Sequence, residues 1–352
     1  MLSSAVDASA TLRRRNDLTM TRAILTPIAE AGDRFSDFAP YVASINDAGT
    51  VAFQAALRSG GTGVFTGSRG TVVEVAAGAT AIVNRFYSHP DIDRDGRVCI
   101  YGALASGGEG VVVLERGGAL PIADTNGPFA RIGPLGPTMN DAGDVAFRAD
   151  TKAGPSGVFV RRGDAVVGVA DTSVFAGFQG LPVVDGAGRV VFRADLGDGR
   201  QGIYASRGEG AEALVVTGPR FRELGLFPSV NGAGTVAFTA TLEGGGAGVF
   251  SVAGGEVTPV VATNAGFESF RGALMDGAGS VFFYATPRGG QLGIYAALDA
   301  STAIVSIGDP YLDSAIVELA LNPVSINAGG QLAIRLRLAN GRQLIVRADP
   351  VG

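Results

Sequence analysis

The sequence predicts an all-β protein, a seven-bladed β-propeller of four-stranded blades, and three observations support this prediction. An eight-residue phrase of the form Asn/Asp-x-x-Gly-x-x-x-Phe/Ile recurs seven times along the chain. Glycine accounts for 54 of the 352 residues, about twice the usual share, without the three-residue period of collagen. No stretch shows the apolar period of an amphipathic helix. Many short strands separated by glycine-containing turns at a regular spacing are typical of a propeller.

The spacing of the phrase matches one propeller blade per repeat. Its copies begin at Asn46, Asp93, Asn140, Asp185, Asn231, Asp276 and Asn327. Neighbouring copies are 45 to 51 residues apart, close to the ~40–45 residues of a WD40 blade and the ~50 of a kelch blade. We therefore expect a single seven-bladed propeller over residues 22–352, preceded by a disordered tail of residues 1–21.

Each repeat reads as four short strands joined by turns, and the fifth repeat shows their order. An apolar segment, residues 227–230, leads into the phrase. Asn231 and Gly234 then predict a tight turn, because an asparagine side chain bonds the local backbone and glycine accepts a positive φ. The second, third and fourth strands follow at residues 236–240, 248–252 and 257–262, separated by glycine turns.

The two ends of the chain predict how the ring closes. The first six repeats each contain a fourth strand, at residues 72–76, 120–124, 166–171, 214–217, 257–262 and 303–307. The seventh repeat ends after its third strand, residues 343–348. The missing strand is found at the start, where residues 24–30 are similar to residues 120–124. We therefore predict that this N-terminal strand completes the last blade and pairs its exposed edge, which gives 28 strands in all.

The repeats resemble a known sequence family. The phrases Asn46-Asp-Ala-Gly-Thr-Val-Ala-Phe53 and Asn231-Gly-Ala-Gly-Thr-Val-Ala-Phe238 are similar to those of the bacterial NxxGxxAF tandem-repeat proteins of the choice-of-anchor type. The resemblance extends from about residue 22 over nearly the whole chain. It implies a β-propeller-like fold, but no reaction and no catalytic residues. Members of that family are often secreted and anchored at the C-terminus; we expect no anchor here, because the sequence ends at Gly352.

Charge and composition exclude several classes of partner and cofactor. The net charge of −5 argues against nucleic acid or an anionic membrane surface as the main partner. One cysteine and one histidine are too few for the usual zinc sites, so we expect no metal and no other cofactor. Residues 91–96 read Asp-x-Asp-x-Asp-Gly, like the opening of a calcium loop, but Gly102 stands where that loop needs a glutamate. We interpret this segment as the turn of the second repeat, with a metal site as the alternative.

His89 departs from the repeat. Four residues before the start of each phrase, the other repeats carry Val42, Gly136, Leu181, Phe227, Gly272 and Pro323. The lone imidazole is either a hydrogen-bonded structural residue or a binding residue or general base, since histidine titrates near neutrality. Tyr87 and Arg85 stand close by in the sequence. We therefore keep His89 as a candidate base and Tyr87 as a candidate acid.

Arginine and phenylalanine recur where each fourth strand meets the next first strand. We predict that these connections are the longest loops and gather on one face of the ring. Either their arginines are solvated while phenylalanines pack below, or guanidinium groups converge above the channel and bind a carboxylate, sulfate or phosphate. The candidate ligand-binding residues are Arg34, Arg85, Arg131, Arg222 and Arg271.

Three further series of residues follow the repeat and are interpreted as structural. Cys99 aligns with alanines, valine and phenylalanine of the other phrases, so we expect a buried core thiol. The phenylalanines that end most phrases predict packing between blades. One residue further on, Arg148 and Arg193 predict ion pairs with Asp150 and Asp195 respectively, within or between blades.

Three functions are consistent with these patterns. The first is a stand-alone propeller that binds a small-molecule or oligosaccharide-like polar or anionic ligand on its loop-rich face, as a monomer. The second is a metal-independent lyase, cyclase or isomerase with its site at the channel mouth. The third is a scaffold that binds a partner protein.

The N-terminus leaves two alternatives for localisation. Arg13-Arg-Arg-Asn is similar to a twin-arginine export signal, but Asp17 interrupts the following residues and no apolar region of the required kind follows. Met20 is an alternative start to Met1. We favour a cytoplasmic protein, with export as the alternative.

Overall fold

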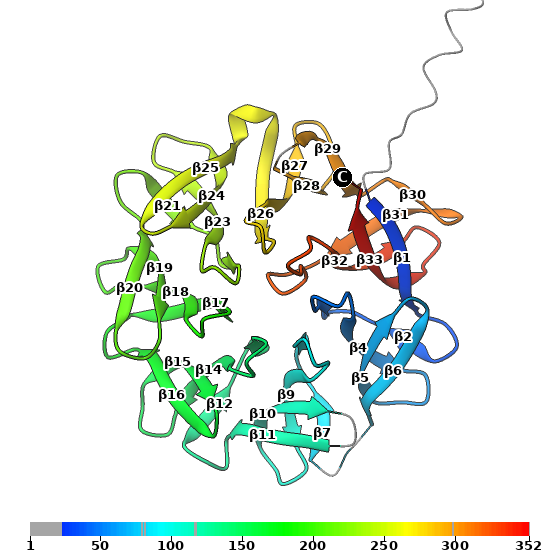
Figure 1. The fold of residues 1–352 in the computed structure, drawn as a ribbon, viewed down its shortest axis with the longest axis horizontal. Helices are drawn as coiled ribbons and strands as arrows, with labels where there is room; N and C mark the ends of the chain where they lie inside the picture. Colours follow the sequence, from blue (N-terminus) through cyan, green and yellow to red (C-terminus); the bar gives the residue numbers. More distant parts are fainter. Residues whose placement is uncertain (1–22, 79, 81, 116–117, 298, 352) are drawn as a thin grey trace, which may run out of the picture.

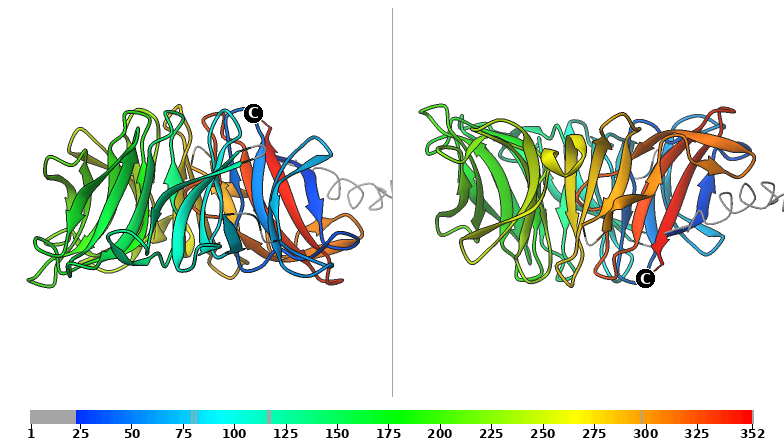
Figure 2. Two further views of the ribbon diagram at one scale, coloured as in Figure 1. Left: turned by 90° about the horizontal axis from the view of Figure 1, so that it is seen from below. Right: turned by 90° about the horizontal axis from the view of Figure 1, so that it is seen from above.

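The computed structural model describes residues 23–351 except residues 79, 81, 116–117 and 298, so the tail predicted for residues 1–21 lies outside the described residues. Seven antiparallel sheets surround a central axis, which confirms the predicted seven-bladed β-propeller (Figure 1). Side views show that the ring is thinner along this axis than across it (Figure 2). The described residues contain no helix long and apolar enough to span a membrane.

Blades one to four follow the predicted order from the inner strand, nearest the axis, to the outermost strand. Blade one comprises β2 (Phe35–Asp37), β3 (Ser44–Ile45), β4 (Val51–Leu57), β5 (Thr62–Ser68) and β6 (Thr71–Ala77). Blade two comprises β7 (Val83–Phe86), β8 (Asp91–Ile92), β9 (Val98–Leu104), β10 (Glu109–Glu115) and β11 (Gly118–Asp124). Blade three comprises β12 (Phe129–Ile132), β13 (Thr138–Met139), β14 (Val145–Thr151), β15 (Ser156–Arg162) and β16 (Ala165–Asp171). Blade four comprises β17 (Gly177–Val184), β18 (Val190–Asp195), β19 (Gln201–Ser206) and β20 (Ala211–Val216).

Blades five to seven complete the ring. Blade five comprises β21 (Phe221–Leu224), β22 (Ser229–Val230), β23 (Val236–Leu242), β24 (Ala247–Ala253) and β25 (Glu256–Ala262), followed by a 3₁₀ turn, η1 (Thr263–Ala265). Blade six comprises β26 (Phe267–Met275), β27 (Val281–Pro287), β28 (Gly293–Ala296) and β29 (Asp299–Ser306). Blade seven comprises β30 (Pro310–Tyr311), β31 (Ser314–Ala320), β32 (Leu332–Leu338), β33 (Gln343–Pro350) and β1 (Ala23–Glu30).

The inner strands differ from the prediction of four strands in every blade. In blades one, two, three and five the inner strand is split into two short segments that pair with the same second strand. In blade one, Phe35 pairs with Leu57 while Ser44 pairs with Ala52 at the other end of β4. Proline interrupts each of these inner strands, and it lacks the N–H that a continuous ladder needs. The residues between the two segments are therefore free to leave the ladder.

The N-terminal strand closes the ring as predicted. β1 pairs antiparallel with β33, from Ala23 opposite Pro350 to Glu30 opposite Leu344, and the two strands lie side by side in Figure 1. The backbone N–H of Ala31 donates to the carbonyl of Gln343 over 2.9 Å and extends the pairing. The first described residues of the chain thus supply the outermost strand of its last blade.

The asparagine that starts the phrase joins neighbouring blades as well as folding its own turn. Asn140 Oδ1 accepts hydrogen bonds from the backbone N–H groups of Ala142 and Asp144, both over 3.0 Å. Its Nδ2 donates to the carbonyl of Asp185, the equivalent residue of the next blade, over 3.0 Å. Asn327 repeats this bond to Asn46 over 2.9 Å across the closure between blades seven and one.

Two of the blades whose phrase starts with aspartate pair it with an arginine, and in blade four this arginine replaces the asparagine amide. Asp185 Oδ1 accepts from the turn backbone, and its Oδ2 accepts from Arg189 Nε over 2.9 Å. Arg189 Nη2 then donates to the carbonyl of Gly234 in the next blade over 3.1 Å. Asp93 and Arg97 are paired in the same way over 2.6 Å. In blade four the arginine of this pair therefore supplies the donor that aspartate lacks.

Asn140→Asp should destabilise the protein by ~1–3 kcal/mol, because the bond to Asp185 is lost and the new carboxylate faces Asp144. Adding Asp144→Arg should recover most of this loss, since it recreates the arrangement of Asp185 and Arg189. Urea unfolding of the single and double variants measures both effects. If the double variant is no more stable than Asn140→Asp alone, the arginine does not replace the amide.

Aromatic side chains form the core of the blades and pack between them. In blade one, the rings of Phe35 and Phe53 lie 5.7 Å apart, edge to face, and Phe53 stacks on Phe65 at 5.7 Å. The same cluster includes Ile28 and Ile345 of blade seven, which confirms the predicted packing between blades. Cys99 is fully buried in a cluster with residues of blade three, as predicted for a core thiol.

Candidate functional site

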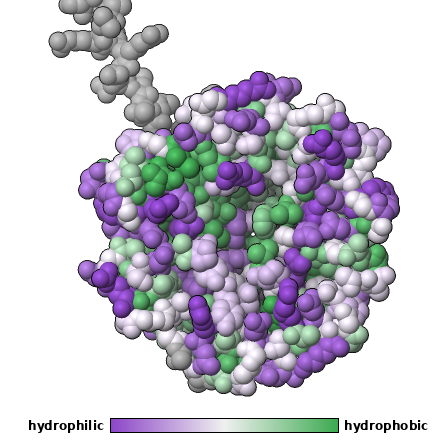
Figure 3. All heavy atoms as spheres, turned by 180° about the vertical axis from the view of Figure 1, so that it is seen from behind, coloured by the Kyte–Doolittle hydropathy of each residue, from purple (hydrophilic) through white to green (hydrophobic). Residues whose placement is uncertain are grey.

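The ring has two faces with different connections. The turn face carries the Asx turns that follow the inner strands, such as residues 46–50. The crossover face carries the connections between blades, such as residues 31–34, and the hairpins between second and third strands, such as residues 58–61. Most blade connections and most of these hairpins span four or five residues, for example 172–176 and 196–200, and the link between β2 and β3 spans six. The prediction that the blade connections form the longest loops is therefore wrong. A space-filling view of one face shows the ring hollowed at its centre, with hydrophobic and hydrophilic residues both reaching the rim (Figure 3).

Tyrosines and arginines of blades one to three gather along the split inner strands; we name Tyr41, Arg85, Tyr87, Tyr101 and Arg131 the tyrosine–arginine cluster. The rings of Tyr87 and Tyr101 lie 5.8 Å apart, edge to face, and the Arg85 guanidinium lies 5.9 Å from the Tyr87 ring. Tyr101 Oη donates to the carbonyl of Pro134 in blade three over 3.4 Å. The three tyrosines are half-buried and the two arginines are exposed.

The pKa shifts of two tyrosines tie the members of the cluster together. Burial raises the pKa of Tyr41, which Arg85 lowers and Tyr87 raises. Burial also raises the pKa of Tyr101, with Glu109, Tyr41 and Tyr87 acting in the same direction and Arg131 against them. Both tyrosines therefore keep their hydroxyl protons at neutral pH. The Tyr41 hydroxyl can donate a hydrogen bond to a ligand, whereas the Tyr101 hydroxyl already donates to Pro134 and can accept one.

A polar groove of about 330 Å³ between blades three and four continues from this cluster. Arg131 and Arg148 both line it, together with Asp150 and Gln179. Arg131 Nε lies 3.5 Å from Asp150 Oδ2, and Arg148 Nη1 donates to the carbonyl of Gly180 over 3.2 Å. Burial lowers the pKa of Arg148, Asp150 raises it and Arg131 lowers it. The guanidinium groups of Arg131 and Arg148 thus have one carboxylate, that of Asp150, as their common neighbour. The groove has room for an anionic group of a ligand beside them.

The five predicted ligand-binding arginines do not form one ring. Arg85 and Arg131 occupy equivalent positions, opposite Ala103 and Asp150 of their blades, and belong to the cluster. In blade five Glu223 takes that position, and the exposed Arg222 precedes it.

The other two arginines lie apart from the cluster. Arg34 lies over the Phe65 ring at 4.5 Å and pairs with Glu74 of the outermost strand of its blade. Arg271 lines a separate, apolar cavity of blades five to seven.

His89 lies in the wall between blades two and three. Only 8% of its surface is exposed, and its Nε2 has no hydrogen-bond partner among the described residues. Burial lowers its pKa to about 4, so the imidazole is neutral at pH 7. A Cβ atom on Gly136 of blade three would lie 2.8 Å from His89 Cε1, which shows how closely the next inner strand covers the ring.

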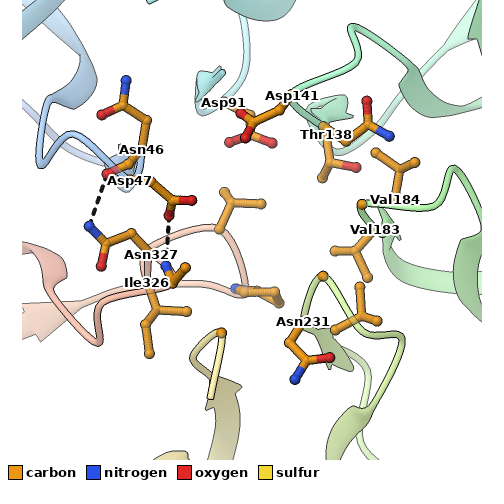
Figure 4. Close-up of a pocket in the computed structure, with 18 of the residues that line it drawn as sticks. Asn46, Asp47, Asp91, Thr138, Asp141, Val183, Val184, Asn231, Ile326 and Asn327 are labelled. Atoms are coloured by element: carbon orange, nitrogen blue, oxygen red, sulfur yellow. Dashed lines mark hydrogen bonds between the residues drawn. The ribbon is translucent and has the colours of Figure 1, made fainter. Parts of the chain in front are cut away.

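A second hollow lies on the axis at the turn face, with a volume of about 390 Å³ and residues of all seven blades in its wall. Figure 4 shows Asp91 and Asp141 side by side in it, and Asn46 joined to Asn327. Asp91 accepts hydrogen bonds from the backbone N–H groups of Ile92 and Met139 over 2.9 and 2.8 Å. Burial raises the pKa of this carboxyl to about 7.

The carboxylates of residues 91–96 are engaged within the fold. Asp91 lies in β8 and bonds to blade three, while Asp93 Oδ1 accepts from the N–H groups of Asp95 and Arg97 over 3.0 and 2.8 Å. Among the residues that the structure describes, no three His, Cys, Asp or Glu side chains come together in a way that could hold a metal ion. The segment forms the Asx turn of its blade.

Sequence reasoning missed part of the site. Tyr41 lies between β2 and β3, the two segments of a split inner strand, and the repeat pattern did not single out this position. Arg148 was assigned to an ion pair with Asp150, but in the structure the partner of Asp150 is Arg131. The predicted pair of Arg193 and Asp195 is confirmed at 3.0 Å. The sequence did contain a signal for Arg148. This residue occupies the same position of the repeat as Tyr101 of blade two, so the repeat alone places these two polar side chains at equivalent points of neighbouring blades.

No family model matches the chain, and no curated protein matches it significantly. Two solved structures of similar architecture are oligogalacturonate lyases. One, in complex with manganese, has a TM-score of 0.60 and 10% identity, covering 94% of this chain and 99% of the lyase. The other, from Vibrio parahaemolyticus, has a TM-score of 0.58 and 12% identity, covering 93% of this chain and 98% of the lyase. At these identities the likeness concerns the fold alone: the chain shares the β-propeller architecture of these two proteins.

Proposed function

We propose that the protein binds an acidic oligosaccharide along the tyrosine–arginine cluster, without catalysing a reaction on it. The observation that carries this proposal is the gathering of Tyr41, Tyr87 and Tyr101 with Arg85 and Arg131 on three neighbouring blades. Tyrosine rings offer an apolar face to a sugar ring and a hydroxyl to its polar groups. Exposed guanidinium forks suit carboxylate or sulfate substituents.

The groove between blades three and four supports a ligand longer than one sugar. Arg131 belongs to both the cluster and the groove, so one chain of sugars could contact Arg85 and Arg131 and place a further acidic group beside Arg148. The surrounding protein is acidic overall, so this local positive charge provides selectivity for an anion. The oligogalacturonate lyases named above act on an acidic oligosaccharide, but the ligand class proposed for this chain rests on its own side chains.

One observation favours a metal-independent enzyme as the second candidate. Burial keeps His89 neutral at pH 7, so its imidazole could accept a proton, and Tyr87 lies two residues away in the sequence. For this to occur, the inner strand of blade three would have to move away from His89, which it covers at Gly136. If a reaction of the wild-type protein is found, an unchanged rate in a His89→Leu variant would exclude His89 as the base.

The binding proposal predicts that trigalacturonate binds in a saturable, salt-sensitive way and that a neutral trisaccharide does not. Arg85→Ala and Arg131→Ala should each weaken binding about 10- to 100-fold, because each removes a charge-assisted hydrogen bond worth ~1.5–3 kcal/mol. Isothermal titration calorimetry with trigalacturonate and maltotriose measures both effects.

Arg200→Ala is the matched control, since Arg200 is an exposed arginine of the same face that pairs with Asp198 at 2.7 Å on a blade-four hairpin. It should bind as the wild type does. Equal affinity for the neutral sugar, or wild-type affinity in the Arg85→Ala/Arg131→Ala double variant, would overturn the proposal. So would the absence of binding to oligomers of galacturonate, mannuronate and sulfated galactose alike.

A further inference from the structure

A separate cavity, of about 220 Å³, lies along the inner strands of blades five to seven. It adjoins the axial hollow at Pro323. Its wall includes Phe227, Arg271, Gly272, Leu274, Tyr284 and Leu321. This volume is below the ~300–1,000 Å³ of sites for drug-sized ligands, so it suits a molecule of about one ring.

The cavity wall is almost entirely apolar. The Tyr284 hydroxyl donates to the carbonyl of Leu319 over 2.7 Å, so the tyrosine presents its ring rather than a free polar group. Phe227 lies between β21 and β22 and is 38% exposed, although its side chain is large and apolar. An apolar ligand would cover surface that now faces water, which favours binding.

A comparison within the ring shows that this space is specific to blades five and six. Phe227 and His89 occupy the same position of the repeat, and Gly272 and Gly136 occupy that position in the blades that follow them. A Cβ atom on Gly136 would meet His89 at 2.8 Å, whereas a Cβ atom on Gly272 would have no atom within 4 Å. The gap that His89 fills between blades two and three is therefore open between blades five and six.

Arg271 places a positive charge at this mainly apolar cavity, in which Asn322 is the other polar lining residue besides Tyr284. The Arg271 side chain is exposed, and it makes no ion pair or side-chain hydrogen bond with another of the described residues. It lies near enough to Tyr284 to lower the pKa of that residue, which burial raises. A guanidinium that has no partner within the described part of the chain, beside an apolar wall, is complementary to a ligand with a ring at one end and a carboxylate at the other.

We infer that this cavity binds a small aromatic monocarboxylate, with its ring over Gly272 between Phe227 and Tyr284 and its carboxylate on Arg271. This site lies on blades five to seven and does not depend on the proposed oligosaccharide site of blades one to four. The two can therefore be tested separately.

The test is titration of the full-length protein with phenylacetate and with phenylacetamide, followed by ligand-observed NMR and calorimetry. We expect saturable binding of phenylacetate and binding of the amide at least 10-fold weaker, because the amide lacks the charge. Arg271→Gln should remove this preference. Gly272→Val should abolish binding of both compounds by filling the cavity, and it should fold, since the backbone there is extended and the space is open.

Gly118→Val is the matched control, because Gly118 also lies in a strand and a Cβ atom there would likewise have no atom within 4 Å, but on the outermost strand of blade two. It should bind phenylacetate as the wild type does, and so should the Arg85→Ala/Arg131→Ala variant. The inference is overturned if phenylacetate shows no saturable binding, if the amide binds equally well, or if folded Gly272→Val retains wild-type affinity. Loss of binding in the Arg85→Ala/Arg131→Ala variant would place phenylacetate in the oligosaccharide site instead.

Discussion

Deleting residues 1–30 should abolish the cooperative folding of the ring. β1 covers the outer edge of β33 from Pro350 to Leu344. It buries Ala23 in the core of blades six and seven, and Ile28 and Ala29 in a cluster shared with blade one. Without it, β33 presents an unpaired edge and the ring has no strand linking its two ends. We expect a loss of at least ~5 kcal/mol, comparable to the total stability of many domains. Thermal unfolding followed by circular dichroism, with size-exclusion chromatography to detect aggregates, measures the outcome.

A circular permutant provides the matched control for this deletion. Ala23 lies opposite Pro350, so residues 23–30 can be attached after residue 352 through a hairpin turn in a chain that starts at residue 31. This permutant contains the same strand and should regain a single cooperative transition. A truncated chain that melts cooperatively at the wild-type temperature would show that ring closure by β1 is not needed for stability.

Asp91 and His89 should give the protein two opposing pH dependences of stability. Burial raises the pKa of Asp91 to about 7, with the N–H groups of Met139 and Ile92 lowering it and Asp93 and Asp141 raising it. Between about pH 4 and 7 the folded protein holds this proton and the unfolded chain has lost it, so this contribution to stability falls as pH rises. At ~1.4 kcal/mol per pH unit the change is on the order of 4 kcal/mol.

His89 acts in the other direction. Burial lowers its pKa from 6.5 to about 4, so between these values the unfolded chain binds the proton and the folded protein does not. Its contribution is fully present above pH 6.5 and is lost as pH falls through 4, on the order of 3 kcal/mol in all. The pH dependences of these two contributions therefore offset each other between about pH 4 and 6.5. Replacing one of the two residues should reveal the pH dependence that comes from the other.

The variants Asp91→Ser and His89→Leu separate these contributions, and both residues occur naturally at equivalent positions, as Ser229 and Leu181. The free energy of unfolding of Asp91→Ser, relative to that of wild type, should increase as the pH rises from 4 to 7. The relative free energy of unfolding of His89→Leu should decrease as the pH rises from 4 to 6.5. Urea unfolding across pH 4–8 measures both slopes. Ser229→Ala removes the equivalent bond to Met275 without an ionisable group, so its effect should be the same at every pH. Parallel profiles for all three variants would show that neither buried group titrates as described.

Periodicity predicted those features of the fold that repeat. The turn at Asn46, the second strand that follows it and the buried Phe53 recur in blade after blade, so seven copies of a weak local signal reinforce one another. The closing strand was predictable for the same reason, because residues 24–30 are similar to a fourth strand and one blade lacked such a strand. The split inner strands were not predicted, since proline and local register differ from one repeat to the next.

The candidate site depends on residues that do not repeat. Arg34 and Arg85 both adjoin a phenylalanine in the sequence, yet Arg34 reaches Glu74 on the outermost strand while Arg85 lies by Tyr87 near the axis. Arg34 precedes the residue that pairs with Leu57, whereas Arg85 follows the equivalent residue, Val83, by two positions. This shift of three residues moves the arginine side chain from the outermost strand of the blade to its inner strand. Arg148 likewise bonds to the next blade rather than to Asp150.

By itself, the sequence determined the number of blades, the order of their strands and the partner of the N-terminal strand, because these follow from the spacing of turns and apolar residues along the chain. The tertiary structure decided which arginines and tyrosines meet, that His89 is covered by Gly136, and that the space beside Gly272 is open. These features depend on how side chains of neighbouring blades fit together across some 45 residues of sequence, a relation that local patterns do not encode.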